Sequence, residues 1–373
     1  MSAIVFTPPQ AMLADIANRF FLDRWPVESA RQQLTSESGF DRDLWAEMAE
    51  VGWMGIAVPE ELGGTGLGAV ELVSLVEPMG RHLFASPFVS TQLVIQGLLS
   101  AGAEEGAEAL RQEWLPRLAS GAIASLAAVD TDGSWELTSC TSRAEAVGSK
   151  VVLHGSKSFV LDAEEADVFL VTATFQGESA LVVLEKSQVP EAALAREIVI
   201  DETRRSYRLS LDGIEVDGSS VVQGEAAGGA QSAIGEMALL LVSAEAVGGT
   251  AGVLDVVVDY LKTRTQFDRP IGSFQALKHP TVDILIGLER ARSHLYHAAT
   301  VFGEAEAEVA LRMLKAEASD AFAFAGDRAV QFHGAFGFTY ECDAQLFLRR
   351  ALWCQSQYGD ALHHRKRLAD LVL

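Results

Sequence analysis

Cysteine and basic residues are scarce in this sequence, and both shortages exclude classes of function. Among 373 residues there are only three cysteines, Cys140, Cys342 and Cys354, and their spacing matches neither a disulfide framework nor a metal site. We therefore expect a reducing compartment, the cytoplasm, and no metal. Lys and Arg number 29 against 51 Asp and Glu, a formal net charge of −22. Because nucleic-acid binding needs a clustered positive field, we expect no such partner.

Long uncharged apolar runs are also missing. The nearest approach is Ala238 to Tyr260, which Glu245, Asp255 and Asp259 interrupt. Since a membrane-spanning helix needs about 20 consecutive apolar residues, we expect this stretch to be a buried core helix, and we expect no membrane contact. The opening MSAIVFTPPQ has no basic segment followed by an apolar one, so it predicts no export signal.

Changes in hydrophobic periodicity divide the chain into three regions. Residues 1–120 carry apolar residues at helical spacing, 121–225 alternate with a period of two, and 226–373 return to helical spacing. With 49% hydrophobic residues the chain has enough apolar side chains for a large core. We expect an α+β protein with a helical domain, a small β domain and a second helical domain in this order. The middle strands are expected at 151–162, 167–175, 179–186, 196–202 and 207–217.

A short connection between two long C-terminal helices carries a cation. The segment RTQFDRPIGS, residues 264–273, separates two helical patterns, and Pro270 excludes a continuous helix. A second segment, AVQFHGAFGF at 329–338, ends a helix at glycines that let a backbone approach a phosphate. The glycine-rich stretch 51–68 lacks the Lys-Ser/Thr of a phosphate-binding P-loop, so we interpret it as a structural turn.

These segments resemble those of the acyl-CoA dehydrogenase family. In that family an R-x-x-F-G-x-P-I-x-x-F-Q segment binds the diphosphate and adenine of FAD, and a guanidinium suits a diphosphate because it offers two donors. A helix-ending A-x-Q-x-x-G-G-x-G segment approaches the diphosphate of a neighbouring subunit. The resemblance implies a helical N-terminal domain, a small β-barrel or sandwich domain and a C-terminal four-helix bundle. The residues that it assigns to FAD are Arg264, Phe267, Gln275, Gln331 and Gly334.

The middle region matches the family less closely. Family members place the Trp and Thr of an N-G-x-K-x-W-I-T-N hairpin against the flavin ring, and the corresponding run here is HGSKSFVLD, residues 154–162. Phe159 takes the Trp position and Leu161 the Thr position, so an aromatic wall is kept and a hydroxyl is lost. Ser134 corresponds to the Ser of the family's T-E-P-x-x-G-S-D turn, which lines the flavin and the thioester.

Dehydrogenation of an acyl-CoA requires a carboxylate that removes the α proton while a hydride leaves the β carbon for the flavin. The resemblance points to two positions for this base, and neither carries a carboxylate. Gly359 follows the matching Tyr358 where many members have Glu, and Ala238 occupies the position that another group uses. The nearest carboxylates are Asp360, adjacent to the first position, and Glu236, close to the second.

The empty base positions are similar to those of bacterial heteromeric members, some of which act on steroid side chains, in which only one of two unlike subunits supplies the base. The resemblance therefore implies FAD-dependent α,β-dehydrogenation of an acyl-CoA, with electrons passed to an electron-transfer flavoprotein and a base-bearing homologous chain as partner in a tetramer. Two alternatives stay open. One is a self-sufficient homotetramer that uses Asp360 or Glu236 as base, and the other is a structural chain that only supports its partner's site.

The remaining polar residues near the C-terminus have structural explanations. We expect Arg349 and Arg350 to form ion pairs along their helix with Glu341 or Asp343. His363 and His364 are adjacent, so on a helix their side chains point about 100° apart and form no metal pair. We expect both histidines at the surface.

Overall fold

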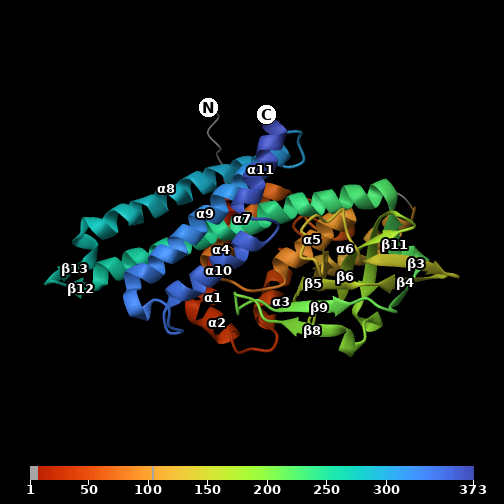
Figure 1. Ribbon diagram of the computed structural model, residues 1–373, viewed down its shortest axis with the longest axis horizontal. Helices are drawn as coiled ribbons and strands as arrows, with labels where there is room; N and C mark the ends of the chain where they lie inside the picture. Colours follow the sequence, from red (N-terminus) through yellow and green to blue (C-terminus); the bar gives the residue numbers. More distant parts are fainter. Residues whose placement is uncertain (1–6, 103–104) are drawn as a thin grey trace.

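The computed structural model describes residues 7–102 and 105–373, and its helices and strands follow the expected order (Figure 1). The N-terminal part is helical, and some of its helices begin at a capped position. At the start of α3, for example, the carboxylate of Asp41 accepts a hydrogen bond from the backbone N–H of Leu44. The N-terminal helices are α1 (Pro8–Arg24), α2 (Val27–Gln33), α3 (Arg42–Glu50), α4 (Ala69–Arg81), α5 (Phe88–Ser100) and α6 (Glu105–Ala119).

The middle part consists of two sheets. In the larger, seven-stranded sheet, β10-β4-β3-β6-β7-β11 are neighbours and β1 pairs in parallel with β6; the smaller sheet has the order β2-β5-β9-β8. The strands are β1 (Ala124–Ala127), β2 (Val129–Asp130), β3 (Arg143–Val147), β4 (Lys150–His154), β5 (Ser156–Leu161), β6 (Val168–Phe175), β7 (Glu178–Glu185), β8 (Leu194–Glu197), β9 (Ser206–Ser210), β10 (Glu215–Asp217) and β11 (Val221–Gln223).

The prediction of a strand at residues 196–202 is wrong. The strand β8 ends at Glu197, and the next residue, Ile198, is 98% exposed. The backbone leaves the sheet after Glu197 because Asp201 is held elsewhere. Its buried carboxylate accepts hydrogen bonds from Arg350 and from Thr203. An alternating apolar pattern therefore marks a loop here.

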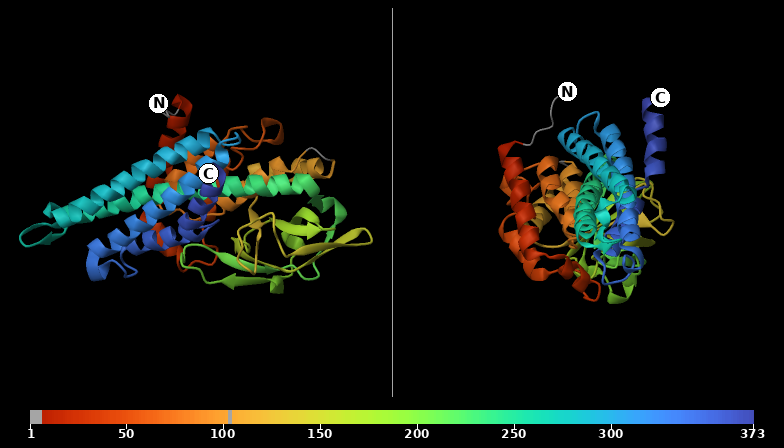
Figure 2. Two further views of the ribbon diagram at one scale, coloured as in Figure 1. Left: turned by 45° about the horizontal axis from the view of Figure 1, so that its top comes forward. Right: turned by 90° about the vertical axis from the view of Figure 1, so that its left-hand side faces the viewer.

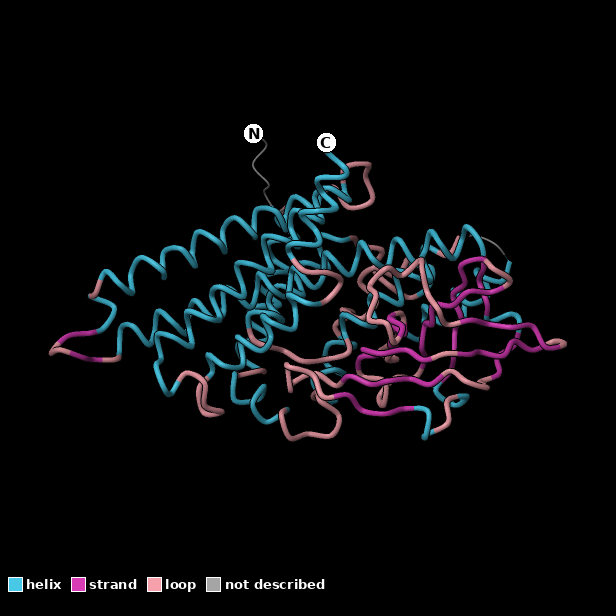
Figure 3. Tube along the Cα trace, in the orientation of Figure 1, coloured by secondary structure: helices cyan, strands magenta, loops and turns pink. Residues whose placement is uncertain are grey.

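The C-terminal part is a helical bundle around one very long helix. Helix α7 (Gly224–Thr263) spans 40 residues, about 60 Å at the helical rise, and passes through the whole molecule (Figures 1 and 2). A two-stranded turn, β12 (Thr265–Gln266) and β13 (Arg269–Pro270), connects it to the next helix and forms the far tip in Figure 3. The other helices are α8 (Gln275–Thr300), α9 (Ala307–His333), α10 (Asp343–Ser356) and α11 (Ala361–Val372).

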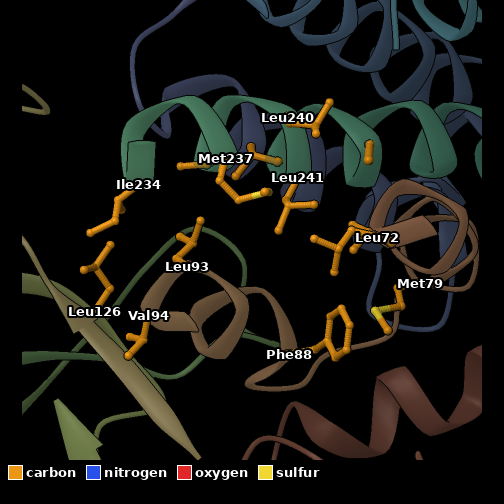
Figure 4. Close-up of a cluster of buried hydrophobic side chains, with 14 of the residues drawn as sticks. Leu72, Met79, Phe88, Leu93, Val94, Leu126, Ile234, Met237, Leu240 and Leu241 are labelled. Atoms are coloured by element: carbon orange, nitrogen blue, oxygen red, sulfur yellow. The ribbon is translucent and has the colours of Figure 1, made fainter. Parts of the chain in front are cut away.

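Helix α7 is long and apolar enough to cross a membrane, but 94% of its most apolar window is buried within the protein. It is therefore the expected core helix. Figure 4 shows its apolar side chains facing those of α4, α5 and the strand β1. Helix α4 approaches it at two glycines: a Cβ on Gly80 would lie 2.1 Å from the carbonyl oxygen of Glu245, and one on Gly248 would lie 1.8 Å from that of Glu77. Only glycine permits this contact.

The α+β fold class is confirmed, as are the helical N-terminal region and the structural turn at residues 51–68, which contains the short helix Glu60–Leu62. The last N-terminal helix ends at Ala119 and the last middle strand at Gln223. We propose 1–120, 121–225 and 226–373 as the three domains.

Candidate active site

Two cavities lie where the β domain meets the long helix. The outer cleft has a volume of about 530 Å³ and the inner cavity about 40 Å³. Trp135 and Tyr358 line both of them, so these two side chains form the partition. The outer cleft is otherwise bordered by residues 134–138, by Gln231, Glu236 and Leu239 of α7, by Glu308 and Arg312 of α9, and by His363, His364 and Arg367 of α11.

An aromatic cluster of Trp135, Phe159, Trp353 and Tyr358 separates the cavities. The Trp135 ring lies 5.7 Å from the Phe159 ring, nearly parallel to it, and 4.6 Å from the Tyr358 ring. Phe159 and Tyr358 both have positive φ angles, 55° in each case, which an aromatic residue adopts only when its surroundings hold it. For Phe159 the restraint is a hydrogen bond from its N–H to Glu197, at 3.0 Å. The indole of Trp135 thus covers the aromatic wall that the sequence predicted.

The loop with Tyr358 and Gly359 is held by a buried lysine. Lys315 on α9 is 1% exposed, and its ammonium donates to the carbonyl oxygens of Cys354, Gln355 and Gly359 at 3.0, 3.3 and 2.9 Å. Burial lowers the pKa of Lys315 to about 8. This single group ties the last carbonyls of α10 to the loop that follows, and the sequence did not reveal it.

Helix α11 holds the same loop from the other side. The ring Nε2 of His364 bonds to the carbonyl oxygen of Tyr358 at 2.9 Å, and the Asp360 carboxylate accepts the N–H of His363 at 2.8 Å as the helix cap. Burial, helped by the charge of Lys315, lowers the pKa of His364 to about 4, so the ring is neutral near pH 7. His364 is 1% exposed, so its expected surface position is wrong; its ring is needed inside to bind the loop.

Gly359, at the position where many relatives carry the base, has a backbone that resists a side chain. Its φ is +98°, and a Cβ there would lie 2.7 Å from Cδ2 of His363 and 3.0 Å from Nε2 of His364. A glutamate at this position therefore requires the loop or α11 to move. Of the two nearby carboxylates, Asp360 is engaged as a helix cap. Glu236 lines the outer cleft, where burial and then the charge of Glu308 raise the pKa of its carboxyl.

A buried ion cluster forms one side of the inner cavity. Arg350, 0% exposed, pairs with Asp201 and Glu245, and Glu245 also accepts from Arg204. The expected pairing of Arg350 along its own helix is wrong, because these acids lie on the loop after β8 and on α7. Arg349 pairs with Glu202 and Asp343 with Arg31, so the other expected pairs are also absent. In the sequence Glu245 interrupts an apolar helix, and this charge was the available signal for the buried ion cluster.

The other predicted FAD residues lie together at the far tip of the molecule. Arg264, Phe267, Gln275, Gln331 and Gly334 are all exposed, and we call them the hairpin end. Stacking of Tyr260 on His333, with ring centroids 3.9 Å apart, places the end of α9 beside the end of α7. Phe267 is 83% exposed, and within residues 7–102 and 105–373 no carboxylate pairs with the Arg264 guanidinium.

The hairpin end and the aromatic cluster are far apart within one chain. Val242 of α7 lines the inner cavity, and Arg264 follows it by roughly 22 residues, or about 33 Å along the helix. Figures 1 and 2 show the tip and the β domain at opposite ends of the molecule. The diphosphate and the ring of one flavin dinucleotide are joined by a short ribityl chain, so one FAD does not contact both sets of residues of the same chain.

The order of domains, helical, β and helical, with a cleft between the β domain and a long core helix, is the order that the resemblance implies. Sequence profiles of the acyl-CoA dehydrogenase N-terminal domain and C-terminal domain match residues 7–122 and 228–371. The chain belongs to the acyl-CoA dehydrogenase family, which confirms the resemblance. The β domain lies between the two matched ranges.

Several relatives are similar over nearly their full length. An acyl-CoA dehydrogenase named IpdE2 from Mycobacterium tuberculosis is 30% identical over 351 residues, 92% of each chain. A chain in the crystal structure of the ChsE4-ChsE5 complex from Mycobacterium tuberculosis has a TM-score of 0.88 and 26% identity, covering 99% of this chain and 98% of that one. The Tcur3481-Tcur3483 steroid ACAD gives a TM-score of 0.85 with 26% identity, covering 98% and 97%.

FAD is the cofactor of this family, and the two sets of residues fit it differently. At the hairpin end, an exposed guanidinium and an exposed aromatic ring suit a diphosphate and an adenine. At the aromatic cluster, Trp135 lies against the Phe159 ring, where the resemblance would place the flavin. The residues expected at the diphosphate are therefore exposed, whereas the Phe159 ring expected at the flavin has Trp135 against it.

Proposed function

We propose that this chain is the base-lacking subunit of a heteromeric acyl-CoA dehydrogenase. The observation that carries the proposal is Gly359, because its positive φ and the close histidines exclude a glutamate from the loop as it is folded. At the second position, Ala238 is fully buried and carries no carboxylate. The catalytic base then comes from a homologous partner chain.

The contribution of this chain is its hairpin end. Arg264 would hold the FAD diphosphate across the interface, Phe267 would cover the adenine, and Gln275, Gln331 and Gly334 would complete the site. When bound there, FAD accepts the hydride that leaves the β carbon of the acyl group. Ser134 of this chain borders its own outer cleft and Phe159 its inner cavity, where Trp135 lies beside the Phe159 ring.

An exposed apolar stripe supports assembly with another chain. Val282, Leu285 and Ile286 of α8 are 52%, 46% and 50% exposed, and their spacing puts them on one helix face. Such a stripe on a soluble domain marks an interaction surface. We propose a tetramer, and the resemblance to the ChsE4-ChsE5 complex favours one with unlike subunits.

The substrate is an acyl-CoA, and the outer cleft of about 530 Å³ has the size of a ligand site. One solved relative supplies the class of acyl group: it is a steroid ACAD, and we propose for this chain a role in steroid degradation. Electrons would pass to an electron-transfer flavoprotein. We place the protein in the cytoplasm, where its three free thiols stay reduced.

The first rival is a self-sufficient homotetramer with Asp360 or Glu236 as base. Asp360→Asn tests it cleanly because Asn also caps a helix. We expect the variant, and likewise Glu236→Gln, to keep turnover of the reconstituted complex within a few fold. A loss of about two orders of magnitude or more, the scale of a general base, would place catalysis in this chain and contradict the proposal.

The second rival is a structural chain that binds neither flavin nor substrate. It differs in what Arg264 does: in a purely structural chain, replacement of that side chain leaves the flavin content of the complex unchanged. Copurification with a base-bearing partner, followed by the absorbance ratio of flavin to protein, separates the two.

A further inference from the structure

One wall of the inner cavity is polar, although binding of a plain hydrocarbon chain requires no polar wall. Most of its lining is apolar, from Val89, Leu93, Leu126, Leu161 and Val242. Against these stand the charged side chains of Arg204 and Glu245. Burying charge costs free energy unless hydrogen bonds compensate it, so the partners of each group decide what the wall does.

Arg204 has a buried donor without a partner. Its side chain is 7% exposed, and one Nη donates to Glu245. The Nε–H is buried and has no acceptor within the described part of the chain. A buried donor left unsatisfied destabilises the folded protein, so an acceptor in the cavity that reaches the Nε–H would stabilise it.

The size of the cavity limits the acceptor to a small group. About 40 Å³ is close to the roughly 30 Å³ that one water molecule occupies. Of an acyl-CoA, a cavity of this size would admit only the end of the acyl chain. A chain that arrives from the outer cleft passes Trp135 and Tyr358, which line both spaces.

Charge balance decides between a neutral and an anionic acceptor. Arg204 and Arg350 face the carboxylates of Asp201 and Glu245, so the pairs that touch one another carry no net charge. A further carboxylate would bring a negative charge with no free counterpart into a buried site. A carbonyl or hydroxyl oxygen accepts the same hydrogen bond without that cost.

We propose that Arg204 is a specificity-determining residue that hydrogen-bonds a neutral oxygen, such as a ketone, near the end of the acyl group. This inference rests on the proposed function, because it requires that the outer cleft of this chain binds acyl-CoA thioesters. It adds the class of substrate: oxygenated acyl chains in preference to plain alkyl chains.

The test measures dissociation constants by calorimetry for the complex with its partner, using three series of acyl-CoA probes from butanoyl to decanoyl length. One series is plain, one has a ketone at the penultimate carbon, and one has a terminal carboxylate. For at least one length we expect the ketone to bind about tenfold more tightly than the plain chain, the ratio that 1.4 kcal/mol gives.

Arg204→Met removes the donor and should abolish this preference. If the Met variant fails to fold, Arg204→Lys replaces it in the test, because it keeps a cation beside Glu245 and removes the Nε–H. The preference for the ketone over the plain chain should also decrease in this variant. Arg208→Met is the matched control, since its side chain is 60% exposed on β9. The preference should survive in it.

Three results would overturn the inference. Equal binding of the ketone and plain series would show that water satisfies Arg204. Tighter binding of the carboxylate series would show that the wall selects anions. If no probe binds at all, the proposed function fails and this inference fails with it.

Discussion

At the scale of single residues, Gly359 combines an empty base position with a strained backbone. Gly359→Ala should lower the free energy of unfolding by about 2 kcal/mol, because a side chain at φ +98° is strained and its Cβ meets both histidines of α11. Urea unfolding measures the change. Gly213→Ala is the control, with φ +81° and open space around the Cβ, and should cost about 1 kcal/mol. Equal costs for both variants would mean that α11 does not restrict the loop.

Lys315 is the second residue whose role is clear from its contacts. Lys315→Met should lower the free energy of unfolding by about 3 kcal/mol, since it leaves buried carbonyls of Cys354 and Gly359 without a donor. Near-ultraviolet circular dichroism should change as well, because Tyr358 sits between these carbonyls and Trp135. The exposed Lys366→Met on α11 should do neither. Unchanged spectra for Lys315→Met would separate the lysine from the aromatic cluster.

The sequence identified single candidate residues where their positions in one linear motif were sufficient to find them. Gly359, Tyr358 and Phe159 were found because each occupies a position in a linear pattern. Lys315 and Trp135 were missed because their partners lie on other segments: the lysine binds carbonyls of α10, and the tryptophan stacks on β5. No periodicity along one segment reports such contacts.

At the scale of elements, α11 is attached to the active-site loop through a neutral histidine. The pKa of His364 is about 4 in the folded protein and about 6.5 when unfolded. Between these values the unfolded chain binds more protons, so stability is lost as pH falls from about 6.5 to 4 and is constant above. His82 has a pKa lowered to about 4 by burial and acts in the same direction.

We therefore expect the melting temperature to fall through this pH window. His364→Gln should make the fall shallower, because one of these two histidines no longer takes up a proton on unfolding. His363→Gln, at an exposed neighbouring position, should leave the profile unchanged. An identical slope in the His364→Gln protein would mean that other groups cause the acid sensitivity.

Secondary structure was predictable to different degrees in different elements. The long helix was evident because apolar residues continue past Ala238 with only isolated charges, and burial of 94% of its apolar window agrees. The strand expected at 196–202 failed because Asp201 pairs with Arg350, which lies far along the chain. A buried ion pair thus prevented the strand that the local alternating pattern predicted. The sequence alone does not show which acidic residue pairs with which arginine.

At the scale of the whole molecule, the two sets of residues that the resemblance assigns to FAD lie at opposite ends of one chain. Motifs predicted both parts, yet only the structure shows their separation of about 33 Å along α7. Because one FAD does not contact both, we propose that the hairpin end acts on a neighbouring subunit. The exposed stripe on α8 offers a surface for that neighbour.

We propose that this chain completes a partner's FAD site through Arg264, and the FAD-to-protein ratio tests this most directly. We predict little FAD on the chain purified alone, and FAD that acyl-CoA bleaches in the complex with a base-bearing partner. When the complex carries Arg264→Ala, FAD should bind about tenfold more weakly. Arg143→Ala, at an exposed position, is the control and should leave FAD binding unchanged. Stoichiometric FAD on the chain alone that acyl-CoA bleaches, or FAD content unaffected by Arg264→Ala, would contradict the account.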